Sequence, residues 1–345
     1  MESDSSSHKY NISFEDERTF WKKYVINKWI KYSNRCPACN IYSLKLKKVK
    51  LAVNPYKLQC NKKNCRKIVN IRKNTIFEFF SHTPISILIN AAELFICDNN
   101  NGIKTIEILR ERYHLSSLGQ KNIYKFFNIL RKCISQYYYD VYNLEKFADN
   151  NALKNIAVDE SLFVHDYDGT QEWVIGLIDI QTKKIRLELA HERNENILKK
   201  IIQHHVGYNN TIISDGWEAY NWLRDYGYHH IVHVHGRNDF GMGNEATSHI
   251  ESIWGQLKGL IVSIYNALKP KNFIYYLKEM EFRYEVKDKN NKEKINQLIS
   301  ILEYCYSTCN LTFISKDDLI DYDKEYYANS DSQDEDEFDE EDEDH

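Results

Sequence analysis

Three carboxylates stand where side chains could converge to do chemistry. Asp159 lies inside one apolar segment, Asp215 follows another directly, and Glu251 lies on a helical pattern. Ligand sites form where the strands of such sheets end. Carboxylates gathered at one spot repel one another and stay ionised only beside divalent cations, and Mg²⁺ or Mn²⁺ prefers such oxygen ligands. The pattern therefore predicts a site for two metal ions that assist phosphoryl chemistry.

Each carboxylate also has an ordinary structural explanation. An Asp at a strand end commonly caps a turn or a helix, and a Glu on a helix is commonly solvated. Glu251 stands at the edge of an apolar face that includes Ile250, Ile253 and Leu257. Trp254, on the same face, is interpreted as a packing residue. The catalytic interpretation is favoured by the order of the three carboxylates along the chain and by the elements around them.

Four cysteines early in the chain have the spacing of zinc ligands. Cys36 and Cys39 are separated by two residues, and Cys60 and Cys65 follow after 20 intervening residues. Two thiolates spaced in this way can bind one tetrahedral ion. The second pair is separated by four residues, which is looser than the usual two. We predict one structural zinc ion held by all four cysteines.

The charges of the chain are segregated. Residues 18–77 contain 17 Lys or Arg and no Asp or Glu, whereas residues 331–345 contain 11 acidic residues and no basic one. The formal net charge of −4 therefore hides a basic body. A block of one sign suits the neutralisation of a phosphate backbone and predicts double-stranded DNA as the partner. The alternative is a lysine-rich surface that is merely solvated.

The segment before the carboxylates is predicted to be helical. Apolar residues recur at helical spacing over residues 83–96, 103–115 and 116–133, with a Thr-Pro before the first helix and Ser residues before the last. Two helices joined by a short turn have the outline of a helix-turn-helix, and the last helix carries Lys121, Lys125, Arg131 and Lys132. A small helical bundle has the same outline without binding DNA.

The carboxylates lie among predicted strands. Residues 155–164, 172–180 and 184–190 are three consecutive β-rich segments, and helices then alternate with the short strands 211–215 and 229–235. Three strands followed by alternating helix and strand is the order of a ribonuclease H-like fold, a mixed sheet flanked by helices. In that fold the first and fourth strands are neighbours. Asp159 and Asp215 are therefore expected to lie next to each other, with the late helix crossing there.

These residues together resemble a family. The stretches "CPAC", "LQCNKKNCRK", "VDES", "WVIGLID", "SDGWEAY", "HIESIWGQLK" and "FIYYLKEMEFRYE" are similar to those of DDE-type transposases of the Merlin superfamily and its related bacterial insertion-sequence transposases. The similarity extends over residues 36–284, and its last four stretches are the most specific.

The resemblance implies roles for individual residues. Asp159, Asp215 and Glu251 match the catalytic triad, which holds two Mg²⁺ (or Mn²⁺) ions, and the Glu follows the second Asp by 36 positions. Lys258, two turns after Glu251 on the same helix face, matches a basic residue that contacts the DNA end. The implied activity is that of a cut-and-paste DNA transposase that binds terminal inverted repeats, cleaves the strand there and joins the freed end to target DNA. Because two ends are cut and joined together, a homodimer or higher assembly is expected.

Two positions qualify the resemblance. His235 matches a frequent His that could orient a phosphate or a metal-bound water, or it could be an ordinary polar residue on a half-exposed strand. Ser248 stands where relatives often carry an Asn shortly before the Glu. Two other functions remain open: a domesticated, catalytically silent DNA-binding protein, and a ribonuclease H-like nuclease without strand transfer.

The predicted organisation follows from these patterns. We expect a mixed α/β chain divided into a disordered N-terminus (1–13), a basic helix and zinc ribbon (14–80), a helical DNA-binding region (81–148), a ribonuclease H-like catalytic domain (149–310) and an acidic disordered tail (317–345). No apolar run is long enough to cross a membrane, and no secretory signal is recognisable. An intracellular location is therefore expected, in the nucleus if the host is eukaryotic.

Overall fold

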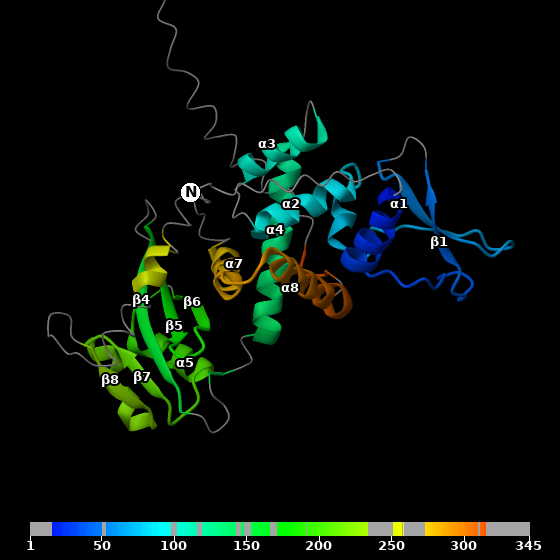
Figure 1. Cartoon of the computed structure of the whole chain (residues 1–345). Coiled ribbons are helices and arrows are strands. Elements are labelled where there is room, and N and C mark those ends of the chain that lie inside the picture. The colour runs from blue at the N-terminus through cyan, green and yellow to red at the C-terminus, as the bar shows by residue number, and fades with distance from the viewer. Residues whose placement is uncertain are drawn as a thin grey trace, which may run out of the picture.

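A computed structural model describes most of the chain. It covers residues 16–49, 53–97, 102–115, 119–142, 146–147, 153–165, 171–190, 192–233, 251–256, 258, 273–309 and 311–314. A small three-stranded sheet, a group of helices and a five-stranded mixed sheet follow one another along the chain (Figure 1). The mixed α/β class predicted from the sequence is confirmed.

The five-stranded sheet has the order β6-β5-β4-β7-β8. Its strands are β4 (Asn155–His165), β5 (Gln171–Asp179), β6 (Ile185–Ala190), β7 (Thr211–Ser214) and β8 (His229–Val232). The first three pair antiparallel as a meander, whereas β7 runs parallel to β4 and β8 parallel to β7. The first and fourth strands of this sheet are neighbours, as the ribonuclease H-like prediction requires, and the predicted fold is confirmed.

The central strand β4 is covered on both faces. Ile156 and Val158 belong to a core with α5 (Glu195–His205) and the 3₁₀ helix η4 (Glu218–Tyr226). Ala157, between them, belongs to a second core on the opposite face, which is completed by Ile253 and by α7 (Phe273–Val286). Successive side chains of a strand point to opposite faces. The alternation therefore places Asp159 on the face of α7 and its neighbour Glu160 on the face of α5.

The small sheet precedes the helices. It consists of β1 (Leu44–Lys48), β2 (Tyr56–Cys60) and β3 (Ile68–Val69), all antiparallel. Two helical segments, α1 (Asp16–Phe20) and the π-helical η1 (Trp21–Ile30), come before it. Trp21 and Trp29 of η1 are buried in the core that also holds Leu44 and Tyr56 of the sheet. The basic, aromatic helix read in the sequence thus uses its aromatic residues for packing.

The helical region shares that core. Its members are α2 (Ile85–Cys97), α3 (Gly102–Tyr113), α4 (Gln120–Tyr137) and, from the C-terminal end of the chain, α8 (Asn291–Tyr304). In Figure 1, α7 lies between these helices and the five-stranded sheet. Within the described parts of the chain, we find no helix with the length and apolar character needed to traverse a bilayer.

Buried charges tie α7 to both of its neighbours. On one side, Glu279 accepts a 2.6 Å bond from Arg131 of α4. On the other side, Lys278 donates to the carbonyl oxygen of Leu187 in β6 at 2.9 Å and pairs with Glu281 at 2.8 Å. Unpairing a buried charge costs about 3–5 kcal/mol, so these contacts fix the position of α7.

Two basic residues of α4 are buried, although the sequence predicts them on a DNA-binding helix. Arg131 and Lys132 were read as possible DNA contacts, but both are buried, at 6% and 8% exposure. Arg131 pairs with Glu279, and the Lys132 ammonium lies 5.2 Å from the ring centre of Tyr275 on α7. Helical periodicity does not indicate which face of α4 meets α7. Lys121 and Lys125 are the remaining basic residues of the predicted recognition helix.

The carboxyl of Glu93 in α2 gives the stability of this core a pH dependence. Burial raises the pKa of Glu93 to about 7, although the charge of Arg112 opposes the shift, and the hydroxyl of Tyr24 donates to the carboxyl. A group with a raised pKa stabilises the folded state below its unfolded pKa, and the contribution is lost as the pH rises through the folded value. We expect the free energy of unfolding to fall between pH 5 and pH 7.5 by on the order of 2 kcal/mol more in the wild type than in Glu93→Gln.

Urea denaturation at the two pH values measures this difference. Glu107→Gln, which alters an exposed glutamate of α3, provides the matched control and should change with pH as the wild type does. An identical pH response of wild type and Glu93→Gln would contradict the assignment.

Candidate active site and metal centre

Two of the three predicted carboxylates lie on neighbouring strands. In the parallel pair of β4 and β7, Ala157 is opposite Ile213. The same register, continued by two residues, brings Asp159 level with Asp215, which directly follows the end of β7. Each Asp is thus on the element that the sequence predicted for it. The strand pairing brings together two residues that are far apart in the chain.

The helix that carries Glu251 contacts Asp159 through the side chain of Trp254. Residues 251–256 are helical, and Ile253 and Trp254 are buried against the sheet. The indole Nε1 of Trp254 donates to Oδ2 of Asp159 at 2.8 Å. The helical spacing of Trp254 predicts packing alone and gives no indication of this bond. A buried indole N–H usually has an acceptor, and that requirement was the available signal.

The surroundings of Asp159 raise the pKa of its carboxyl. Burial is the largest influence and raises its pKa, the hydrogen bond from Trp254 opposes this, and the negative charges of Asp215 and Glu251 raise the pKa further. Asp215 and Glu251 are therefore close enough for their charges to act on Asp159. Such repulsion is relieved by a divalent cation, for which carboxylate oxygens are suitable ligands.

The carboxylates are nevertheless more widely spaced than the ligands of a bound ion. Among the described residues, only a cysteine group brings three or more possible ligand atoms within 4.8 Å of one another. Glu251 is exposed at the surface of its helix. The donor set fits Mg²⁺ or Mn²⁺, and joint coordination requires these side chains to move closer together than they lie here.

Of Lys258 and His235, the two residues predicted to assist the triad, the structure describes only Lys258. Lys258 is exposed, and its ammonium lies 5.5 Å from the ring centre of Phe163 on β4. Phe163 in turn packs edge-on against Trp254, at 5.7 Å between ring centres. Lys258 therefore lies beside the strand that carries Asp159. His235 lies outside the described residues, as do the predicted disordered N-terminus (1–13) and acidic tail (317–345).

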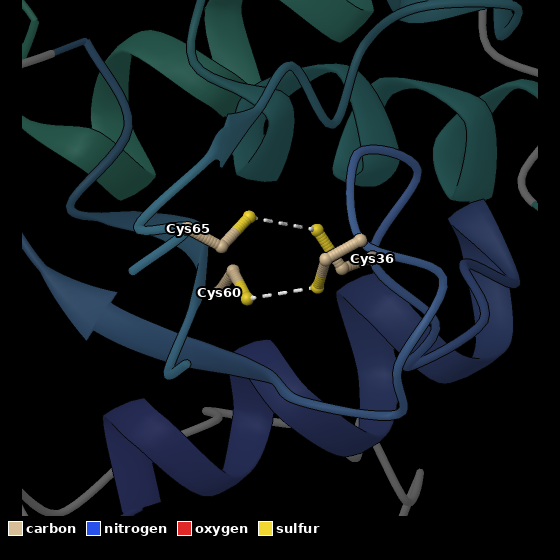
Figure 2. A group of neighbouring side chains, drawn as sticks. Cys36, Cys60 and Cys65 are labelled. Carbon is tan, nitrogen blue, oxygen red and sulfur yellow. Dashed lines mark hydrogen bonds between the residues drawn. The ribbon is translucent and has the colours of Figure 1, made fainter. Parts of the chain in front are cut away.

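The four predicted zinc ligands come together in the small sheet. The sulfur atoms of Cys36, Cys39, Cys60 and Cys65 all lie within 4.8 Å of one another. Two pairs, Cys36 with Cys65 and Cys39 with Cys60, have sulfur–sulfur distances of 3.7 Å. Figure 2 shows the labelled sulfurs turned toward a common centre. Tetrahedral coordination with Zn–S bonds of about 2.3 Å places sulfurs about 3.8 Å apart, so the cluster has the dimensions of a Cys₄ zinc site.

Two tight turns make this geometry possible. After the first pair, Asn40 adopts a left-handed conformation with φ 60° and its N–H donates to the Cys36 carbonyl at 2.8 Å. After the second pair, Arg66 has φ 48° and its N–H donates to the Lys62 carbonyl at 3.2 Å. The turn absorbs the two additional residues between Cys60 and Cys65. The looser spacing of the second pair therefore does not prevent the four sulfurs from converging.

The cluster is also chemically prepared to bind a cation. The hydroxyl of Ser43 lies 2.9 Å from the sulfur of Cys60, and this hydrogen bond is the largest influence that lowers the pKa of the Cys60 thiol to about 6. Metal ions bind the thiolate form. The pKa of the Cys65 thiol is instead raised to about 11, so within the cluster the lowered pKa favours Cys60 as the thiolate ligand.

One segment of the chain is similar to a known protein family. Residues 160–285 match the family model described as the ISXO2-like transposase domain, which confirms the resemblance to transposases over that segment. No curated protein matches the sequence.

Retroviral proteins are among the similar solved structures. A chain of the simian T-cell lymphotropic virus intasome in complex with the PP2A regulatory subunit B56 gamma is 13% identical with a TM-score of 0.30, over 42% of this chain and 53% of that one. The magnesium-bound HTLV-2 integrase catalytic core domain in its dimeric form is 11% identical with a TM-score of 0.25, over 37% of this chain and 86% of that one. This chain spans about half the length of the intasome chain. The strand order and directions described above carry the assignment of the fold.

Proposed function

We propose that this chain, whose residues 160–285 match an ISXO2-like transposase domain, is a DNA transposase of the cut-and-paste type. The observation that carries the proposal is the position of Asp159 and Asp215 at one level of adjacent parallel strands, with Glu251 electrostatically coupled to Asp159. Polynucleotidyl transfer needs anionic ligands for divalent cations at one edge of a rigid sheet. A central strand packed on both faces provides that rigidity.

The reaction would proceed in two displacements at phosphorus. Water attacks the phosphodiester at the end of the element, and the strand breaks with release of a 3′-hydroxyl. That hydroxyl then attacks a phosphodiester of the target, displaces the target's own 3′-oxygen and forms the new joint. Asp159, Asp215 and Glu251 would hold two divalent cations, which would supply activation of the attacking oxygen and neutralisation of charge on the leaving oxygen.

Other residues would orient the groups that react. The indole of Trp254 holds Oδ2 of Asp159 in place. The exposed ammonium of Lys258, next to Phe163, would bind a phosphate of the DNA end. Lys258 and Glu251 lie two turns apart on one helix, so binding DNA at Lys258 would also fix the helix that carries Glu251.

End recognition is assigned to the N-terminal part of the chain. The acid-free segment 18–77 includes the cysteine cluster, and α4 adds Lys121 and Lys125. Two element ends must be processed together, which favours a homodimer or a larger assembly. A DNA substrate implies an intracellular location, and the nucleus in a eukaryotic host.

Incubation of the full chain with labelled DNA that carries the inverted repeats tests the proposal. The genomic DNA that flanks the coding region supplies these repeats. We expect cut products and joined products that appear with Mg²⁺ or Mn²⁺ and vanish with chelator. Cut products without joined ones would identify a hydrolytic nuclease, and end binding without either product would identify a silent DNA-binding protein.

The Trp254 bond yields a quantitative expectation. Trp254→Phe keeps the aromatic packing but removes the N–H that Asp159 accepts, and loss of such a partner of a metal ligand typically costs 10–100-fold. We expect cleavage to fall by about 10-fold or more at low Mg²⁺, with partial recovery at high Mg²⁺. Titration of the cleavage rate with Mg²⁺ measures this effect. The matched control is Trp222→Phe, whose buried indole lies in the core on the opposite face of the sheet.

A further inference from the structure

A cluster behind the carboxylates is centred on one arginine. Arg193 lies between β6 and α5, and its guanidinium is packed against two indole rings. The ring centre of Trp217 is 4.0 Å from the guanidinium carbon, and that of Trp173 is 5.2 Å away. Arginine is the basic residue whose planar guanidinium is best suited to contact with aromatic faces. The side chain is 34% exposed, so its contacts with the two rings, rather than burial, restrict its movement.

The same guanidinium contacts the residue next to Asp159. Its Nη2 donates to Oε2 of Glu160 at 3.2 Å. The other oxygen of Glu160 accepts a hydrogen bond from the hydroxyl of Tyr220, a fully buried side chain of η4. Both oxygens of this buried carboxylate are therefore bonded. Because Glu160 follows Asp159 in β4 and points to the opposite face, its anchoring restrains the backbone that orients Asp159.

The stacked indole belongs to the turn that carries Asp215. The backbone N–H of Trp217 donates to Oδ1 of Asp215 at 2.9 Å. The residue between them is the exposed Gly216, so the backbone of this turn has little intrinsic restraint. Stacking of the Trp217 ring on Arg193 fixes the peptide that holds the Asp215 carboxylate.

We propose that Arg193 is a positioning residue that sets both Asp159 and Asp215 from the opposite face of the sheet, through Glu160 and through Trp217. The inference rests on the proposed function, because it assigns to those two aspartates the role of metal ligands. Arg193 touches neither the substrate nor the metal ions. Its effect is to keep the two carboxylates directed to the same point before a cation arrives.

Manganese binding to the full-length protein tests this role independently of turnover. The Kd for Mn²⁺ is measured by electron paramagnetic resonance, and hydrogen exchange of the Trp217 amide reports on its bond to Asp215. We expect Arg193→Gln to weaken Mn²⁺ binding by about 10-fold and to accelerate exchange at Trp217. Arg193→Lys, which keeps the charge without the planar stack, should give an intermediate result.

Lys199→Gln is the matched control. Lys199 lies on α5, and its ammonium lies 3.5 Å from the ring centre of Tyr226, away from the aspartates. We expect this variant to bind Mn²⁺ and to exchange at Trp217 as the wild type does. If Arg193→Gln does not fold, Trp217→Leu removes the stack from the other side and should weaken Mn²⁺ binding to the same extent.

The outcomes separate this inference from the proposed function. A wild-type Mn²⁺ site that Asp159→Asn eliminates supports the metal site. Unchanged Kd and exchange in Arg193→Gln, in the presence of that site, would overturn the role of Arg193 alone. The absence of any Mn²⁺ site sensitive to Asp159→Asn would overturn the role of Arg193 and the metal-dependent mechanism together.

Discussion

Replacement of Asp159 with Asn is expected to abolish both strand cleavage and strand transfer while the protein still binds DNA ends. Asp159 is the carboxylate on the central strand, and it receives the Trp254 hydrogen bond and the repulsion of the other two carboxylates. The neutral amide keeps the shape but lacks the charge that holds divalent cations. We expect each activity to fall by about 1,000-fold or more.

Gel assays with a labelled element end measure cleavage, joining and binding on the same preparation. Asp215→Asn and Glu251→Gln should lose both activities in the same way, because the proposed reaction uses the three residues as a unit. Asp225→Asn is the matched control, since Asp225 is an exposed carboxylate of η4 in the same part of the chain. Retained strand transfer in Asp159→Asn would refute the proposed mechanism.

Loss of the cysteine cluster is expected to eliminate end binding. The free energy of zinc binding contributes directly to the folding of such small domains. A ribbon without its ion loses the turns that bring the four sulfurs together. We expect Cys60→Ser to release the zinc and to weaken end binding by about 100-fold or more, because the basic segment around the ribbon no longer presents its charges together. Metal analysis of the purified protein and a binding titration at fixed salt measure the two effects.

A second cysteine variant controls for the loss of a thiol. Cys97, on α2, lies outside the cluster, so Cys97→Ser should keep one zinc per chain and the affinity of the wild type. Mn²⁺ binding at the carboxylates should persist in Cys60→Ser, since the five-stranded sheet has cores of its own. Tight end binding by the zinc-free protein would separate the ribbon from DNA recognition.

Local patterns predicted the elements well where short-range physics decides them. The alternation of apolar residues indicated β4, β5 and β6, and the apolar periodicity indicated α2, α3 and α4, within a few residues of their observed ends. The helix expected between the predicted strands 211–215 and 229–235 is a 3₁₀ helix over Glu218–Tyr226, closed by Gly227 with φ 80°. Over so short a segment, the spacing of hydrophobic residues does not distinguish an α-helix from a 3₁₀ helix. The proposed domain boundaries remain predictions, although α8 packs with the N-terminal helices.

Contacts between residues far apart in the sequence could not be predicted from local patterns. Buried side chains on α4 could be expected from its apolar stripe, but Arg131 and Lys132 are buried because α7 supplies Glu279 and aromatic rings there. The stack of Arg193 on Trp217 likewise joins two loops that have no sequence relation. Neither pairing has a periodicity that a sequence pattern could carry.

The amino-acid sequence by itself determined the types of ligand and their order: four cysteines with the spacing of a zinc ribbon, then an aspartate on one strand, an aspartate directly after another, and a glutamate on a later helix. The tertiary structure alone decided how they are held. It closed the Cys60–Cys65 turn around the cluster, brought Asp159 level with Asp215, and placed the indole of Trp254 on Asp159, a bond between residues 95 positions apart. The physical reason is the distance along the sequence over which each kind of interaction acts. Propensity and periodicity act over a few residues, whereas the partner of a buried polar group is chosen by whichever distant side chain the packing of the cores brings within hydrogen-bonding distance.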